Sequence, residues 1–319
     1  MENEILITKH TTKSWFKSAV LGIFMGLAVI IPGVSGAQIA ILFKLYDKLT
    51  YAISNIFKKF KLMILFLIPI VLGIGVGFVA GFFAVKELIE LATFAVVALF
   101  AGMMLGGTPV YLKEIKNSKV SPLKVVLLVV GLIVPISIGA IAVNTNLTFT
   151  VESLTSEWWM FLIAAPIGFV VAITQLIPGL SATSTLLSIG IFKPLMESVS
   201  LTYWKGNPLI FVIYLLLGIG LLVGVFVLSK IINKVIEKYK SHFYWLALGL
   251  SFSSIASMFY NPEIVDYYNG WTTNGVNTVE LSIGIVLFCL GFAGIFAFCL
   301  FTSKKEKANQ ITQKEEIKE

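Results

Sequence analysis

Long uninterrupted apolar runs constrain this chain more than any other feature. Crossing the ~30 Å hydrocarbon core of a bilayer takes about 20 helical residues. Six runs have this length and predict transmembrane helices at about 62–85, 88–112, 123–143, 208–231, 243–260 and 280–302. Hydrophobic residues make up 57% of the 319 positions and charged residues only 13%, unlike soluble chains. The sequence therefore predicts an all-α polytopic membrane protein.

Two further apolar stretches, 15–49 and 158–196, are too long for one ordinary crossing. Each is broken near its middle by Pro-Gly, in the sequences IPGVSG and IPGLSA. Proline removes a backbone donor and clashes with the preceding turn, and the following glycine allows a sharp change of direction. An arm of about 16 residues rises only ~24 Å, which is short for a full crossing. We therefore expect each stretch to form a re-entrant helical hairpin.

The two halves of the chain resemble each other, which indicates an internal duplication. At shifts of 145 to 147 residues the aligned positions are the two Pro-Gly breaks, Gly22 and Gly168, Tyr46 and Phe192, Gly73 and Gly218, Gly75 and Gly220, and Gly102 and Gly249. The first repeat is then 15–143 and the second 157–302, each with one hairpin and three transmembrane helices. Because three crossings is an odd number, we expect the second repeat to be inverted in the membrane.

The placement of lysine predicts the orientation. If the N-terminus lies inside, 21 of the 24 basic residues, all lysine, fall in the internal segments 1–20, 44–61, 113–124, 230–240 and 303–319. This positive-inside bias places the tails 1–14 and 303–319 in the cytoplasm and the linker 144–156 outside. The net charge of +7 then indicates contact with anionic inner-leaflet lipids and not with nucleic acid.

Glycines spaced four residues apart predict close helix packing. The groups are Gly22 and Gly26; Gly73, Gly77 and Gly81; Gly102 and Gly106; and Gly220 and Gly224. Such spacing lets two helix backbones approach each other inside a membrane.

The two hairpin tips carry the candidate binding residues. Each returning half-helix begins just after its break, where amides without helical partners and the positive end of the helix dipole favour an anion. Two such ends, meeting from opposite leaflets, would form a phosphate site at the repeat interface. The candidates are Pro32, Gly33, Ser35, Gly36 and Gln38 at the first tip, and Gln175, Pro178, Gly179, Ser181, Thr183 and Ser184 at the second. Lys44 and Lys193 lie farther along and are expected to flank the two mouths of the path.

Blander interpretations of the same residues stay open at this point. The Pro-Gly pairs can serve only to let helices pack closely, the glutamines can hydrogen-bond between helices, and the lysines can snorkel to the membrane surface. A small-anion or ion transporter, or a channel, with the same hairpins is the alternative function.

The residue inventory argues against a membrane enzyme. The chain has no arginine, and its two histidines, His10 and His242, lie at polar ends. No carboxylate cluster suited to a metal is visible, so we expect no catalytic residue, metal or cofactor. Proton or sodium coupling stays undecided.

The hairpin sequences resemble those of a known family. IPGVSGAQIAILFKLYDKL, followed one repeat later by LIPGLSATSTLLSIGIFKPLM, is similar to the bacterial polyprenyl-phosphate transporter family over about residues 15–302. The resemblance implies a flippase in the bacterial cytoplasmic membrane that carries undecaprenyl phosphate from the outer to the inner leaflet. Such import recycles the lipid carrier of peptidoglycan and other cell-wall precursors.

Overall fold

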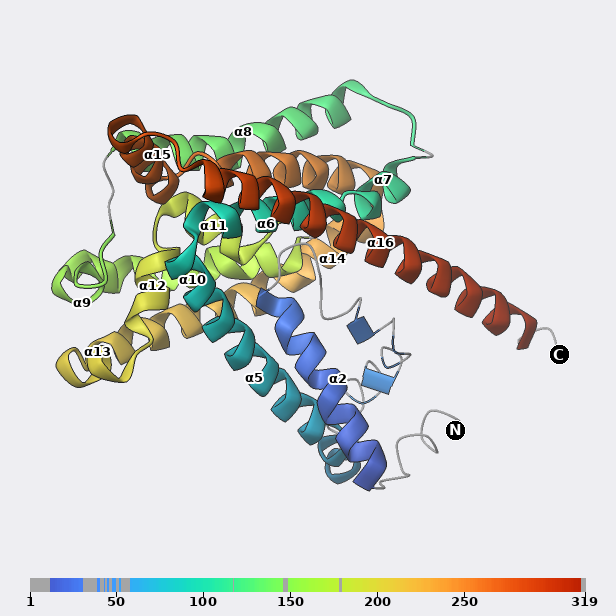
Figure 1. The fold of residues 1–319 in the computed structure, drawn as a ribbon. Helices are drawn as coiled ribbons and strands as arrows, with labels where there is room; N and C mark the ends of the chain where they lie inside the picture. Colours follow the sequence, from blue (N-terminus) through green and yellow to red (C-terminus); the bar gives the residue numbers. More distant parts are fainter. Residues whose placement is uncertain are drawn as a thin grey trace. The chain divides into compact units, whose positions relative to one another are not determined.

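The computed structural model describes residues 12–30, 58–116, 118–145, 149–177 and 180–316, with seven single positions between 39 and 52. Every regular element in these ranges is a helix. The helices are α2 (Thr12–Ile30), α5 (Phe60–Leu91), α6 (Thr93–Gly106), α7 (Pro109–Ile115), α8 (Pro122–Asn144), α9 (Ser153–Ser156), α10 (Trp158–Leu176), α11 (Ala182–Ile189), α12 (Phe192–Ser198), α13 (Leu201–Gly206), α14 (Ile210–Met258), α15 (Pro262–Asn274) and α16 (Thr278–Glu316) (Figure 1).

Six helical segments among the described residues are long and apolar enough to cross a membrane. They are Phe60–Leu91, Thr93–Ile115, Pro122–Asn144, Trp158–Leu176, Ile210–Leu228 and Thr278–Lys304. The predicted all-helical class and multi-pass membrane character are thereby confirmed. The crossing predicted at 243–260 is not among the six, since this stretch contains four serines. It stays a prediction.

Helix α14 is two helices joined by a kink. The backbone of Tyr239 has φ −129° and ψ 36°, outside the helical region. We call residues 210–238 α14a and residues 240–258 α14b. The kink falls in the lysine-rich segment 230–240, which the sequence predicts to lie between two crossings.

The chain divides into two compact units, residues 1–88 with 295–319, and residues 89–294. In the first unit, α2 packs on α5 through glycines. A Cβ atom added to Gly73 would overlap the carbonyl oxygen of Ala19, and one added to Gly77 that of Ile23. Because these contacts advance together along both helices, α2 and α5 run parallel.

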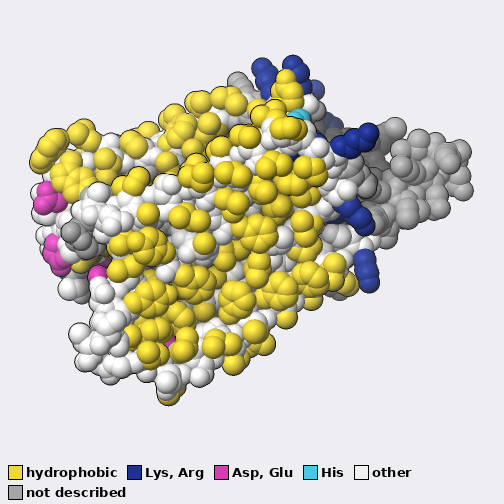
Figure 2. All heavy atoms as spheres, turned by 90° about the horizontal axis from the view of Figure 1, so that it is seen from above, with side chains coloured by type: hydrophobic (Ala, Val, Ile, Leu, Met, Phe, Trp, Pro, Cys, Tyr) yellow, Lys and Arg dark blue, Asp and Glu magenta, His cyan; other side chains and the backbone are white. Residues whose placement is uncertain are grey.

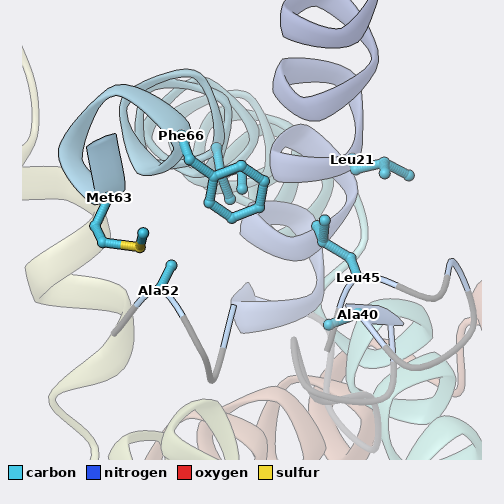
Figure 3. Packing of buried hydrophobic residues seen from close by; sticks show 7 residues of the cluster. Leu21, Ala40, Leu45, Ala52, Met63 and Phe66 are labelled. Carbon is cyan, nitrogen blue, oxygen red and sulfur yellow. The ribbon is translucent and has the colours of Figure 1, made fainter. Parts of the chain in front are cut away.

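A buried cluster joins α2, α5 and the segment between them. Figure 3 shows Leu21 of α2 and Met63 and Phe66 of α5 with Ala40, Leu45 and Ala52. All six are buried. The described positions between α2 and α5 therefore pack back against the helices that flank them.

The second unit contains a matching helix pair. In α10 and α14a, a Cβ atom added to Gly220 would overlap the carbonyl oxygen of Ala165, and Gly224 lies against Phe169 and Ala172. These two helices also run parallel. Met160 of α10, Ile191 after α11, and Ile210 and Ile213 of α14a are buried in one cluster. The chain has thus returned, between α10 and α14a, to the end at which α10 begins.

Two more pairs in the second unit repeat one packing arrangement. Helix α6 packs on α16, where Gly102 meets Phe288 and Gly291 meets Leu99; α14b packs on α8, where Gly249 meets Leu128 and Gly131 meets Leu246. The α6 positions correspond to the α14b positions at a shift of 147, in line with the sequence alignment of Gly102 with Gly249. The buried carboxylate of Glu280 on α16 also accepts a hydrogen bond from the amide of Phe94, at 3.1 Å, and so caps α6.

The packing confirms the predicted close approach to a neighbouring helix backbone at Gly22, Gly26, Gly73, Gly77, Gly102, Gly220 and Gly224. The contacts also bear on one alignment between the two halves. Gly73 and Gly220 both touch a neighbouring backbone, whereas Gly75 and Gly218 have no atom within 4 Å of an added Cβ. In its contacts, Gly73 matches Gly220, at a shift of 147, and not Gly218. Glycines close together on one apolar helix cannot be told apart by sequence when only one of them faces a partner.

The surface fits a lipid environment. Figure 2 shows hydrophobic side chains over most of the visible face. Large apolar residues of α8 such as Val126, Ile133 and Ile141 are more than half exposed. Exposed apolar area of this extent is rare on soluble monomers and normal for helices in a bilayer.

An ion pair at the end of the lysine-rich segment 230–240 fixes α14b to α7. Its atoms, Lys240 Nζ and Glu114 Oε2, lie 2.6 Å apart. The hydrogen bond to Glu114 raises the pKa of Lys240 above its usual value; partial burial opposes this rise and the attraction of the two charges adds to it. A raised folded-state pKa means that the pair stabilises the fold fully below the unfolded-state pKa of ~10.4, and ceases to do so as pH rises through the folded-state pKa.

We expect Lys240→Ala to lower the free energy of unfolding by about 0.5–1 kcal/mol at pH 7, because the lysine side chain is 57% exposed and solvent screens the pair. The difference from wild type should be smaller at a second, higher pH above the folded-state pKa of Lys240, where the lysine is uncharged. Thermal unfolding in detergent at the two pH values measures this. Lys234→Ala, at an exposed lysine of α14a, is the control, and equal losses in both variants would contradict the assignment.

Candidate functional site

The second Pro-Gly break lies between α10 and α11. Helix α10 ends at Leu176, and α11 begins at Ala182 with Ser181 as its N-cap. Ser181 Oγ accepts a hydrogen bond from the amide of Ser184, at 3.4 Å, as a capping serine does. Helix α11 has eight residues, so it rises only ~12 Å before Gly190 ends it with φ 83°. Glycine suits this left-handed position because it has no Cβ.

The predicted residues of the second tip are partly brought together. Ser181, Thr183 and Ser184 are buried in the first turn of α11, whereas Gln175 is exposed at the end of α10. Lys193 lies on α12, beyond the other end of α11. The remaining candidates fall outside the described residues: Pro32, Gly33, Ser35, Gly36, Gln38, Lys44, Pro178 and Gly179.

A line of buried hydroxyls joins α11 to α14b. Ser184 Oγ donates to the carbonyl of Ser254 at 3.0 Å, and Ser188 Oγ lies 2.7 Å from Ser257 Oγ. Each of these four serines is at most 2% exposed. These bonds fix α11 against α14b, since leaving a buried hydroxyl unpaired costs stability.

Sequence reasoning missed Ser188, Ser254 and Ser257. Two signals were present: Ser184 and Ser188 are four residues apart, and Ser251, Ser254 and Ser257 are three apart within an apolar run. Either spacing places hydroxyls on one face of a helix. Neither reveals that the two faces meet.

A cavity of about 570 Å³ lies at the far end of α11 from Ser181. Its lining includes Gly190, Lys193 and Pro194 with the linker residues 149–152, and Thr93, Pro262, Asp266 and Tyr267. Lys193 Nζ is 4.0 Å from Glu197 Oε1, and both side chains are partly exposed. Glu152, Glu197 and Asp266 also line the cavity, so its carboxylates outnumber its one lysine. This charge makes the cavity a poor trap for a phosphate and suits a passage more than a tight site.

No group of three or more metal-ligating side chains occurs among the described residues. The arrangement thus offers hydroxyls and a helix N-terminus near Ser181, and one lysine in the cavity beyond the other end of α11. Such groups can solvate an anion through hydrogen bonds and a partial positive charge.

Comparison with known proteins identifies a relative and a family. A curated protein of Staphylococcus aureus (strain NCTC 8325 / PS 47), named polyprenyl-phosphate transporter, is 28% identical over 291 residues, which cover 89% of this chain and 96% of that protein. No solved structure matches the chain. The family described as VCA0040-like, undecaprenyl phosphate translocase-like, matches residues 25–277. The chain belongs to this VCA0040-like, undecaprenyl phosphate translocase-like family.

Proposed function

We propose that this protein transports undecaprenyl or another polyprenyl phosphate from the outer to the inner leaflet of the bacterial cytoplasmic membrane. The single observation that carries the proposal is the family match over most of the chain. The multi-pass helical structure and the curated transporter relative support it. Inward movement would return the lipid carrier to the side on which cell-wall precursors are assembled.

The second hairpin is proposed to be re-entrant. Helices α10 and α14a run parallel, and Met160, Ile191 and Ile210 are buried together at one end. The chain between the two helices must therefore return to the end at which it started. The short length of α11, ~12 Å, supports a returning arm that stops well inside a ~30 Å core.

An inverted repeat is proposed for the whole chain. It is supported by a helix contact that occurs in both halves. In the first half, Ala19 meets Gly73 and Ile23 meets Gly77. In the second half, Ala165 meets Gly220 and Phe169 meets Gly224. Inverted repeats with broken helices recur in secondary transporters, where the substrate is held at the break and one repeat moves against the other.

Ser181 is the residue we assign to the phosphate. Its oxygen accepts from the Ser184 amide, so its own O–H proton can donate to a phosphate oxygen beside the positive end of α11. Ser184 uses its proton on Ser254 and therefore positions the helix instead of touching the ligand. By the repeat, Ser35 and its neighbours would supply the second half of the site.

The orientation is proposed from charge. In the second unit, lysines cluster at 113–124 and 234–240, and the acidic residues Glu152, Glu157, Glu197 and Asp266 lie on other segments. Lysine-rich segments face the cytoplasm. The cavity at Lys193 would then open outside, where the lipid phosphate is collected, and both termini would be cytoplasmic.

A leaflet assay in proteoliposomes tests the function. Labelled polyprenyl phosphate added to one leaflet should become protected from an outside phosphatase only when the protein is present. A labelled glycerophospholipid is the control lipid, and equal movement of both lipids would indicate a nonspecific scramblase. Movement of free inorganic phosphate or chloride, without movement of the lipid, would favour the small-anion transporter and overturn the proposal.

Glu197→Gln should make the external mouth more attractive to the lipid phosphate. The change removes both the ion partner of Lys193 and one negative charge of the cavity. Exposed pairs contribute ~0.2–1 kcal/mol, so we expect the apparent KM for lipid to fall up to about fivefold. Lys193→Gln should raise it. Glu157→Gln, an acidic residue outside the cavity lining, is the matched control, and a KM unchanged in Glu197→Gln would refute the role of the mouth.

A further inference from the structure

A side chain of α14b hydrogen-bonds to the backbone of α8 next to Pro135. Pro135 has no amide proton, so the carbonyl of Gly131 receives no helical bond from it. One residue later, the amide of Ile136 donates to Ser253 Oγ at 3.1 Å, and the same hydroxyl donates to the carbonyl of Leu132. In a regular α-helix the Ile136 amide and the Leu132 carbonyl would bond each other.

The contact is built into a tight helix pair. Ser253 is fully buried, and Pro135 is buried too. A Cβ atom added to Gly131 would lie 2.6 Å from the carbonyl oxygen of Leu246, and one added to Gly139 would lie 2.7 Å from that of Tyr260. The two helices are thus locked on either side of Pro135. A side chain inserted into a helical ladder beside proline marks a point at which the helix can bend.

The serine next to Ser253 holds the returning helix. The carbonyl of Ser254 accepts a hydrogen bond from Ser184, and the hydroxyl of Ser257 lies against that of Ser188. Helix α14b thus contacts α11 through Ser254 and Ser257, and α8 through Ser253. The first turn of α11 contains Ser181. The Pro135 turn of α8 is therefore connected to the proposed phosphate site through one helix, α14b, and the hydrogen bonds of Ser253, Ser254 and Ser257.

We propose that Ser253 is a positioning residue for transport. Its hydroxyl bonds the Ile136 amide and the Leu132 carbonyl of α8 and thereby bends α8 at Pro135. Because α14b is also bonded to α11, a change in this bend would move α11. The ladder has two arrangements: Leu132 and Ile136 bonded through Ser253, or bonded to each other with Ser253 released. An exchange between two discrete arrangements is what an alternating-access step requires. The inference rests on the proposed transport function.

The test compares Ser253→Ala with Ser251→Ala, a matched change at another buried serine of the same helix. Without the Ser253 hydroxyl, only the direct hydrogen bond from the Ile136 amide to the Leu132 carbonyl can form. The maximal rate of polyprenyl-phosphate transport should fall about tenfold while the apparent KM stays within about twofold, because one hydrogen-bonded state is lost and the headgroup site is intact. Ser253→Thr retains a hydroxyl and should restore most of the rate.

A second readout reports the helix itself. Spin labels at positions 125 and 141, both exposed on α8, are introduced after both cysteines have been replaced. Residues this far apart span ~24 Å in a straight helix. Ser253→Ala should move the pulsed-EPR distance distribution toward this value, whereas Ser251→Ala should not.

The outcomes separate the inference from the function. An unchanged distribution in Ser253→Ala overturns the inference, as does equal loss of transport in Ser251→Ala. A shifted distribution with an unchanged transport rate also overturns it, because the hinge would then not limit transport. If wild-type vesicles move no lipid at all, the proposed function fails, and the distance measurement still decides whether Ser253 controls α8.

Discussion

Replacing Gly220 with alanine should destabilise the second unit severely, while the same change at Gly218 should be harmless. A Cβ at position 220 would overlap the carbonyl oxygen of Ala165 and come within 3.0 Å of its Cα. These are backbone atoms, so α10 and α14a must separate to make room. Overpacking costs about 1–3 kcal/mol, and we expect the upper end because no flexible side chain can yield.

Gly218→Ala is the matched control. Gly218 lies on the same helix and nothing is within 4 Å of its added Cβ. Both substitutions remove a glycine from a helix interior, which by itself favours the helix by up to ~1 kcal/mol in each case. Any difference between the variants therefore reports the contact with α10. Thermal unfolding in detergent, followed by tryptophan fluorescence, measures it. If both variants melt alike, the register of α10 on α14a is wrong.

Ser181→Ala should reduce lipid transport about 10- to 100-fold. A hydrogen bond to a charged group contributes ~1.5–3 kcal/mol, and the substitution removes the hydroxyl that we assign to the phosphate. It also removes the cap on the Ser184 amide, which costs about 1 kcal/mol of stability. The leaflet assay with labelled polyprenyl phosphate measures the rate, and detergent unfolding measures the stability.

The loss of the cap can be separated from the loss of the ligand contact. Thr185→Val removes a hydroxyl from the same helix, one that donates to the carbonyl of Ser181 at 3.0 Å. Loss of this half-buried hydrogen bond should lower stability by ~0.5–1.5 kcal/mol and leave transport within about twofold. Ser181→Thr keeps both the cap and the donor and should retain most activity. Wild-type transport in Ser181→Ala would remove Ser181 from the phosphate site.

The sequence anticipated the break at 177–181 but not the partners of its residues. Pro-Gly followed by serine predicted that a helix ends and a new one begins, and α10 and α11 do so with Ser181 as the N-cap. Ser184 was predicted to lie at the phosphate site. Its hydroxyl donates to the carbonyl of Ser254, a partner that the sequence does not reveal.

Membrane character follows from the sequence alone, because only a continuous run of about 20 apolar residues matches the thickness of a bilayer, and such a run is a local property. The break and the small-residue spacing are local too. The tertiary structure alone decided that Gly220 and not Gly218 meets α10, and that Ser253 enters the ladder of α8. Both depend on the rotation and register of one apolar helix against another, and apolar side chains all round a helix leave these undetermined until the backbones touch.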